Sequence, residues 1–158
     1  MRRLFVRPHG LGATFGSCPS GRVVDSAFAI YQGLEVASSD IEVRGNRFAG
    51  TADRNTAGYG IVVRGGSPRI AGNAIAGWME GVRVESGTPV ISANEISGCW
   101  NRGIYDFSGS TIAGNRFQAN AVGMSNQSPA GGRGSIVTHN VFLDNGWDLS
   151  VELSLIHI

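Results

Sequence analysis

Two stretches, "PRIAGNAIAG" at residues 68–77 and "PVISANEISG" at residues 89–98, carry the same phrase and decide the fold. In each copy an isoleucine stands three residues before an asparagine, and a second isoleucine stands two residues after it. The general form, I/V-x-x-N-x-I/F, recurs around five asparagines: Asn46, Asn73, Asn94, Asn115 and Asn140. They are 27, 21, 21 and 25 residues apart, and Ser26 takes the asparagine place in an earlier, weaker copy. This period predicts a repeat architecture in which each unit buries its apolar face against its neighbours.

A second phrase lies between the asparagines. It is a glycine, or once Asp148, followed by an apolar residue, as in "EGVRV" at residues 80–84. Apolar and charged residues alternate from Val82 to Glu85, which is the pattern of a strand with one buried face. We therefore predict two short strands and no helix in each repeat.

A period of about 21 residues fits two solenoids, the leucine-rich repeat and the parallel β-helix, whereas a propeller blade needs about 40 residues. Leucine-rich repeats need several leucines per unit, but the recurrent residues here are Ile, Val and Phe. We predict an all-β parallel β-helix of about six coils over residues 22–152, after an irregular or incomplete coil at residues 1–21. Each asparagine is expected at a corner, in the left-handed backbone conformation, with its amide bonded to the asparagine of the next coil as a ladder.

Charge and composition exclude other classes. The 13 Lys plus Arg and 12 Asp plus Glu give a net charge of +1, which provides no basic field to recruit nucleic acid or an anionic membrane. No run of about 18 apolar residues is present, so we expect no membrane span. The cysteines, Cys18 and Cys99, have no metal-ligand spacing and are expected to be free thiols.

Both ends of the sequence stand apart from the repeats. Arg7, Pro8 and His9 interrupt the apolar stretch that a signal peptide would need, so no signal peptide is seen. The last residues, "LSLIHI" at 153–158, can be encoded by CTG TCT CTT ATA CAC ATC, which resembles a transposon end used in preparing sequencing libraries. We expect them to be an adapter artefact and the chain to be a fragment of a longer helix, with further coils of its own chain as neighbours.

Over residues 22–152, the "GIxV" and "PxIxxNxIxG" phrases resemble the right-handed parallel β-helix repeat family. This family lies in the pectin-lyase-like superfamily, with periplasmic copper-site maturation proteins and many secreted carbohydrate-active proteins. The resemblance implies a right-handed solenoid, an extracellular or periplasmic location and a polysaccharide partner. No cofactor is evident from the residues, and calcium is implied by the family analogy alone.

The resemblance leaves open whether the chain is an enzyme, because the repeat specifies the coil and the same fold serves lyases, hydrolases, epimerases and adhesins. An active member would be a polysaccharide lyase or a glycoside hydrolase. The catalytic patterns of the family's enzymes are missing here: there is no Asp-Asp pair, no Gly-His-Gly and no Arg-x-Pro-x-x-Arg.

Two insertions into the regular coils are candidate ligand-binding loops, because insertions into solenoids map to loops on one face. The first, "AGTADRNTAGY" at residues 49–59, carries Asp53 and Arg54 as candidate substrate-binding residues. The second is the glycine-rich "SPAGGRGS" at residues 128–135. The alternative for both is a tolerated insertion without a ligand.

Tryptophans in neighbouring coils suggest a sugar platform. Trp78 and Trp100 follow their asparagines by five and six residues, and Glu80 and Arg102 directly precede the next glycine. The apolar face of a sugar packs on an indole while its hydroxyls bond the polar side chains. The alternative is that the tryptophans cover the end of the core and that Glu80 and Arg102 form a surface ion pair.

The outward positions of the glycine strand supply weaker catalytic candidates. A lyase-like site would use Arg83 or Arg64 as the base, with Glu85 or Tyr105 nearby. The alternative is a solvated sheet with Arg64 and Glu85 paired across two coils.

Two further polar residues are assigned structural roles. Asp106 would point inward if alternation holds from Ile104, so we expect it to bond a turn or to lie at a bulge. His139 has no second ligand in metal spacing and is expected to be a turn residue, so that no metal site is predicted.

These observations favour a polysaccharide-binding or polysaccharide-processing β-helix outside the cytoplasm. The alternative is a non-catalytic structural or interaction solenoid of the adhesin, surface-layer or phage-tail type, which would need only the ladder and the apolar stacks.

Overall fold

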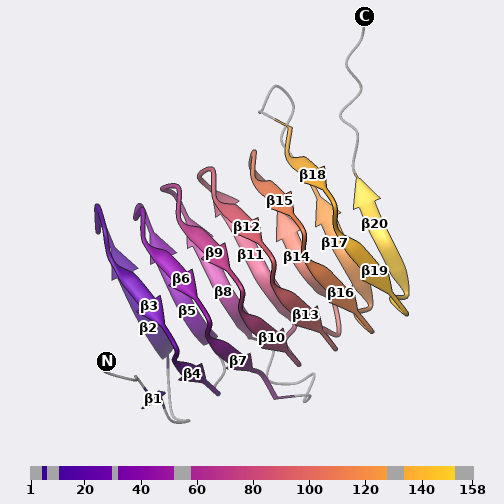
Figure 1. Cartoon of the computed structure of the whole chain (residues 1–158), viewed down its shortest axis with the longest axis horizontal. Coiled ribbons are helices and arrows are strands. Elements are labelled where there is room, and N and C mark those ends of the chain that lie inside the picture. Colours follow the sequence, from indigo (N-terminus) through magenta and orange to yellow (C-terminus); the bar gives the residue numbers. More distant parts are fainter. Residues whose placement is uncertain (1–4, 7–10, 30–31, 52–57, 128–133, 152–158) are drawn as a thin grey trace, which may run out of the picture.

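The computed structural model describes residues 5–6, 11–29, 32–51, 58–127 and 134–151, which contain twenty β-strands and, within these ranges, no helix. The strands form three sheets of parallel strands, which we call sheets A, B and C. In each sheet the strands follow one another along one axis, from the N-terminal to the C-terminal coil (Figure 1). Sheet A holds β1 (Phe5–Val6), β4 (Ala27–Phe28), β7 (Arg47–Ala49), β10 (Ala74–Ala76), β13 (Glu95–Ser97), β16 (Arg116–Gln118) and β19 (Val141–Leu143). Sheet B holds β2 (Leu11–Gly16), β5 (Gln32–Ala37), β8 (Tyr59–Arg64), β11 (Glu80–Ser86), β14 (Arg102–Asp106), β17 (Val122–Asn126) and β20 (Trp147–Val151). Sheet C holds β3 (Arg22–Val24), β6 (Glu42–Arg44), β9 (Arg69–Ala71), β12 (Val90–Ser92), β15 (Thr111–Ala113) and β18 (Ile136–Thr138).

Each coil passes through sheet B, then sheet C, then sheet A. Six such coils run from β2 to β19, which confirms the predicted all-β parallel β-helix of about six coils. The prediction of two strands per coil was wrong, because the phrase around each asparagine is two strands and not one. In "PRIAGNAIAG", β9 ends at Ala71 and β10 begins at Ala74, and the corner between them sends the two triplets into different sheets.

The first coil begins inside the segment that we expected to be irregular or an incomplete coil. Strand β2 pairs in parallel with β5, and Ala13 lies opposite Leu34. Residues 11–16 therefore supply the sheet B strand of the first coil. Residues 153–158, the expected adapter artefact, lie outside the described residues.

The core is built from identical positions stacked from coil to coil. Ile70 lies opposite Ile91 in sheet C, and Ile75 lies opposite Ile96 in sheet A, all fully or almost fully buried. Aromatic members of the sheet A column stack face to face: the Phe28 and Phe48 ring centroids are 4.6 Å apart, and those of Phe117 and Phe142 are 4.8 Å apart. Because no single coil could bury these side chains, the stacking is what stabilises the solenoid.

The asparagines form the predicted ladder at the corner between sheets C and A. Asn73 donates from its backbone N and its Nδ2 to Asn94 Oδ1, each at 2.9 Å, and the same pair of bonds joins each ladder asparagine to the next. The remaining Nδ2 hydrogen reaches a backbone carbonyl, as from Asn94 to Ile70 at 3.0 Å. Ser26 ends the ladder as expected, since its backbone N donates to Asn46 Oδ1.

The prediction that the asparagines themselves adopt the left-handed conformation was wrong, because the residue before each asparagine adopts it. The positive φ angles belong to the residue before each asparagine: Asp25 before Ser26, then Gly45, Gly72, Ala93, Gly114 and His139. His139 has φ 54°, which fits the turn role expected for it. The asparagine side chain thus supplies the hydrogen bonds while its predecessor makes the sharp turn.

A second, shorter ladder that the sequence analysis missed lies at the corner between sheets A and B. Asn120 donates from N and Nδ2 to Asn145 Oδ1, each at 3.0 Å, and Cys99 N donates to Asn120 Oδ1 at 2.9 Å. Each member follows a first-ladder asparagine by five residues, so the N-x-x-x-x-N spacing of Asn115 and Asn140 was the available signal. In earlier coils Cys99 and Trp78 take this place and fill the corner with apolar volume.

Candidate functional site

The outer surface of sheet B gathers the charged and aromatic side chains that the sequence places before and within the glycine strands. Parallel register sets Glu80 beside Tyr59 and Arg102, and sets Arg83 beside Tyr105. We call this surface the sheet B face and define it by ten residues: Glu35, Tyr59, Arg64, Glu80, Arg83, Glu85, Arg102, Tyr105, Phe107 and Gln127.

Six charged side chains form one continuous row of ion pairs across the sheet B face, in the order Glu35, Arg64, Glu85, Arg83, Glu80 and Arg102. The N···O distances along the row lie between 2.9 and 3.3 Å. Glu80 is only 1% exposed, so the two arginines that bind it also compensate for the loss of its hydration. The row confirms the alternative in which Arg64 and Glu85 pair across coils.

Arg83 lies at the centre of this face, among aromatic rings. Its guanidinium carbon is 5.4 Å from the Tyr59 ring centroid, 5.3 Å from that of Tyr105 and 5.1 Å from that of Phe107. Such contacts stabilise a cation and fix its plane. Tyr105 in turn hydrogen-bonds through its hydroxyl to Gln127 Oε1.

The carboxylates of the row stabilise the protonated form of the two arginines that were proposed as bases. The hydrogen bond to Glu85 raises the pKa of Arg64 above its ordinary value. Burial would lower the pKa of Arg83, but hydrogen bonds to Glu80 and Glu85 outweigh it and raise that pKa. Burial would likewise raise the pKa of Glu85, but hydrogen bonds from Arg64 and Arg83 lower it. The carboxylates therefore favour the charged form of Arg64 and Arg83, and the hypothesis that either takes a proton stays a prediction.

The tryptophan platform is not formed. Trp78 and Trp100 are neighbours in adjacent coils, since Trp100 N donates to Trp78 O at 3.0 Å. However, Trp78 is only 2% exposed and packs in the core, so its ring has no free face for a sugar. Glu80 and Arg102 do pair at 3.3 Å, but the buried Glu80 makes this more than a surface ion pair. The alternative, in which a tryptophan fills the end of the coil, holds for Trp78.

The two loop candidates fall largely outside the described residues. Asp53 and Arg54 lie within residues 52–57, and residues 128–133 belong to the second loop. Both ranges are outside the part of the chain that the structure describes. Ser135, at the end of the second loop, is described and donates its hydroxyl to Asp106 Oδ2.

Asp106 has the structural role expected for it. Its side chain is fully buried, and Oδ1 accepts bonds from Ser108 N at 2.9 Å and from Ser110 Oγ at 2.9 Å. Together with the bond from Ser135, these contacts tie the turn after β14 to the end of the 128–135 loop. A buried carboxylate is tolerated there because hydrogen bonds replace its hydration.

Both cysteines are free thiols, as expected. Cys99 is buried, and burial raises the pKa of its thiol to about 12, so it stays protonated and unreactive.

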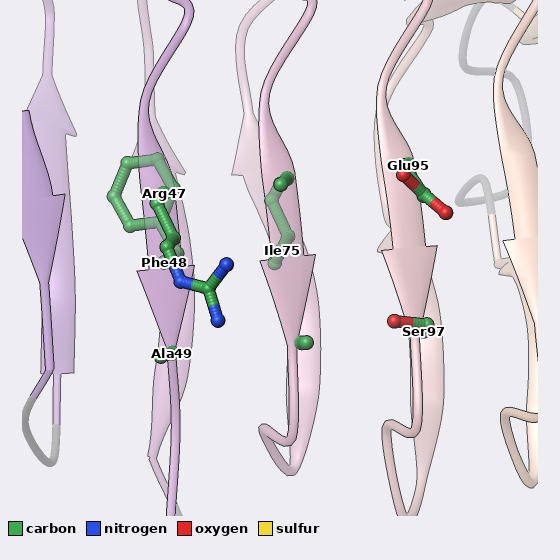
Figure 2. A pocket seen from close by; sticks show the side chains of 8 residues that line it. Arg47, Phe48, Ala49, Ile75, Glu95 and Ser97 are labelled. Carbon is green, nitrogen blue, oxygen red and sulfur yellow. The ribbon is translucent and has the colours of Figure 1, made fainter. Parts of the chain in front are cut away.

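Among the described residues, two of the depressions lie on the outer surfaces of the sheets. One, of about 330 Å³, lies on the sheet B face and is lined by Arg83, Glu85, Phe107 and Gln127. Figure 2 shows the other, of about 250 Å³, on sheet A, where Arg47 and Glu95 stand on either side of β10. Arg83 and Glu85, which were selected from the sequence, line the depression on the sheet B face. The sheet A depression is lined by none of the residues selected from the sequence.

Glu35, Phe107, Gln127 and Tyr59 are members of the sheet B face that were not selected as site residues from the sequence. Among these, Tyr59 carried a pattern that could have identified it. Its signal was its place directly before Gly60, which is the place that Glu80 and Arg102 occupy before their glycines. The register confirms the equivalence, because Glu80 lies between Tyr59 and Arg102.

The described ranges contain neither a metal-binding cluster nor a membrane-spanning helix. Among those residues there is no group of three or more His, Cys, Asp or Glu side chains placed to hold a metal ion. In the same ranges no helix is long and apolar enough to cross a membrane.

Comparison with known families agrees with this architecture. Residues 31–154 match the family model described as the right handed beta helix region. Since the match covers most of the sequence, the chain belongs to the right-handed β-helix family. The comparison with curated proteins finds no match.

Proposed function

We propose that this chain is a polysaccharide-binding β-helix domain that acts outside the cytoplasm, with the sheet B face as its binding surface. The observation that carries the proposal is the depression of about 330 Å³ in which the Phe107 ring lies beside Arg83, Glu85 and Gln127. A half-buried aromatic ring offers an apolar face to a sugar, and the polar groups around it can bond hydroxyls.

The proposal is for binding and not for processing. Both candidate bases are arginines held in the protonated state by carboxylates. Each glutamate of the row is itself engaged by at least one guanidinium, so none of the three is a free acid or base poised for proton transfer.

A glycan array probed with the purified 158-residue chain tests the proposal, with circular dichroism on the same sample to confirm β structure. We expect selective retention that falls by about two- to tenfold in Phe107→Ala, since an aromatic contact contributes about 0.5–1.5 kcal/mol. Trp100→Ala is the matched control, because Trp100 lies at the opposite end of β14 from Phe107. A folded protein that is retained by no glycan would refute the proposal.

A structural or interaction solenoid is the second candidate, and the last described coil favours it. Ile136 is 62% exposed and Trp147 is 73% exposed, and such apolar side chains commonly mark a contact surface. A silent glycan array together with concentration-dependent self-association, abolished by Ile136→Lys, would support this function instead.

A further inference from the structure

The sheet B face is charge-balanced. It carries three arginines and three glutamates, and every one of the six belongs to the row of ion pairs. We propose that the site selects uncharged, hydroxyl-rich glycans and discriminates against uronate polymers. This inference rests on the proposed function and concerns the class of glycan that the site accepts.

A uronate carboxylate needs a cation, and no guanidinium of this face is without a carboxylate partner. To bind a ligand carboxylate, Arg83 would have to exchange its 3.0 Å contacts with Glu80 and Glu85. Glu80 would then depend on Arg102 and Asn101 alone, at 3.3 and 3.4 Å, although it is only 1% exposed. Removing one partner of a buried ion pair is strongly unfavourable.

Arg64 is the most exposed cation of the row, but it is also committed on both sides. It contacts Glu35 and Glu85, each at 2.9 Å. A ligand carboxylate approaching it would meet the negative charge of both glutamates. Like charges brought together at an interface disfavour the partner that carries them, so the same pairs that stabilise the row exclude an anionic ligand.

A neutral sugar can use the bonding capacity that the ion pairs leave open. Each Glu85 oxygen accepts one guanidinium contact and, as a carboxylate oxygen, has a further lone pair for a sugar hydroxyl. Gln127 Oε1 accepts the Tyr105 hydroxyl, and its Nε2 has no partner among the described residues. The site therefore offers an acceptor, a donor and the apolar Phe107 ring, which together suit hydroxyls and a C–H face.

Polymers with a common backbone and different charge test this inference on the 158-residue chain. We use polygalacturonate with its methyl ester, and carboxymethyl cellulose with hydroxyethyl cellulose, in affinity electrophoresis. We expect at least one neutral polymer to be retained about tenfold more tightly than its anionic counterpart, which corresponds to about 1.4 kcal/mol. Its retention should change little between about 0.05 and about 0.5 M salt, because screening acts on charge pairs.

A charge variant separates recognition from folding. Glu85→Gln removes the carboxylate shared by Arg64 and Arg83, so the retention of the anionic polymer should rise severalfold relative to its neutral counterpart. Glu42→Gln is the matched control, because Glu42 also pairs with two arginines, Arg22 at 3.1 Å and Arg44 at 3.5 Å, but on sheet C. This control should leave the preference unchanged.

The outcomes separate the two proposals. Tighter retention of the anionic polymer by the wild-type protein would overturn the neutral-glycan inference and leave polysaccharide binding in place. Retention of none of the four polymers, together with a silent glycan array, would overturn both.

Discussion

At the scale of single residues, the corner between sheets C and A depends on the residue before each ladder asparagine. Glycine occupies this left-handed position at Gly45, Gly72 and Gly114, but Ala93 has φ 53° there. A left-handed residue with a Cβ costs about 1–2 kcal/mol relative to glycine. The coil that contains Ala93 therefore carries local strain that its glycine-bearing neighbours avoid.

We expect Ala93→Gly to stabilise the protein by about 0.5–1 kcal/mol, since relief of the strained φ exceeds the added entropy of the unfolded chain. Urea unfolding monitored by circular dichroism measures the change. The control is Ala74→Gly, in an exposed strand position of β10, which should destabilise the protein. A loss of stability in Ala93→Gly equal to that of the control would contradict this account of the corner.

Single residues also show how far sequence reasoning reached. The ladder asparagines were predicted because they recur along the sequence, and a residue that recurs in each repeat marks an equivalent position in each coil. The residue that makes the turn was misassigned, because Asp25, Ala93 and His139 have little in common with the glycines that fill the same place. Backbone conformation is shared by these corners without a shared residue type.

At the scale of structural elements, the ladder joins the corners of successive coils through buried amides. Asn94 Oδ1 accepts two bonds from Asn73, and Asn94 Nδ2 donates to Asn115 Oδ1 and to Ile70 O. Removing this amide leaves donors and acceptors unpaired in both neighbouring coils. The cost therefore depends on how deeply each ladder position is buried.

We expect Asn94→Ala to reduce the free energy of unfolding by about 2–4 kcal/mol, because several buried groups lose their partners. Asn140→Ala is the matched control at the half-buried end of the ladder, and it should cost about 1 kcal/mol because water can reach the groups left behind. Denaturant unfolding of both variants checks the ranking. Equal losses would show that burial does not set the strength of the ladder.

The sheet B face is the second element whose behaviour follows from its contacts. Hydrogen bonds from Arg64 and Arg83 hold the pKa of Glu85 below its ordinary value despite the opposing effect of burial. A carboxyl group with a lowered folded-state pKa contributes stability above its unfolded pKa, and that stability is lost as the pH falls through the folded value.

We therefore expect the stability difference between the wild-type protein and Glu85→Gln to shrink as the pH falls from about 5 to about 3. Urea midpoints across this range measure the difference. Glu95→Gln supplies a control on sheet A, because it removes a glutamate that has no ion-pair partner among the described residues. A stability difference that is constant with pH would show that the ionisation of Glu85 does not contribute to the pH dependence of stability.

The sequence predicted the members of the sheet B face better than their environment. Alternation placed Arg64, Arg83 and Glu85 outward, and ion pairs join them although a register shift after Val84 sets Arg64 opposite Ser86. The sequence pattern could not show that Glu80 is buried beneath two arginines or that Trp78 fills the core. The burial of both residues depends on side chains in adjacent coils. Burial in a solenoid is decided between repeats, whereas the sequence pattern describes each repeat alone.

At the scale of the whole molecule, stability should vary along the solenoid. Central coils have a neighbour on each side, and Ile91 in β12 is fully buried. In the last described coil, Val137 in β18 occupies the equivalent column and is 37% exposed. Because repeats interact only with their neighbours, the same apolar position contributes less at the end than in the middle.

We expect Ile91→Ala to cost about 2–5 kcal/mol, since it leaves a cavity in a closed stack. Val137→Ala should cost less than about 1 kcal/mol because its site is already partly hydrated. Hydrogen exchange should show the same gradient, with β8, β11 and β14 most protected. Uniform protection from β8 to β20 would contradict a nearest-neighbour solenoid.

The register between equal coils also bears on how such a chain changes in evolution. Asn73 and Asn94 are 21 residues apart, and the strands on either side of them superpose one for one on those of the next coil. A gene duplication that copies residues 73–93 would therefore insert one complete coil, with its corner, its three strands and its apolar layer already matched to both neighbours. Recombination in units of whole coils would therefore change the length of the solenoid in steps of one matched layer.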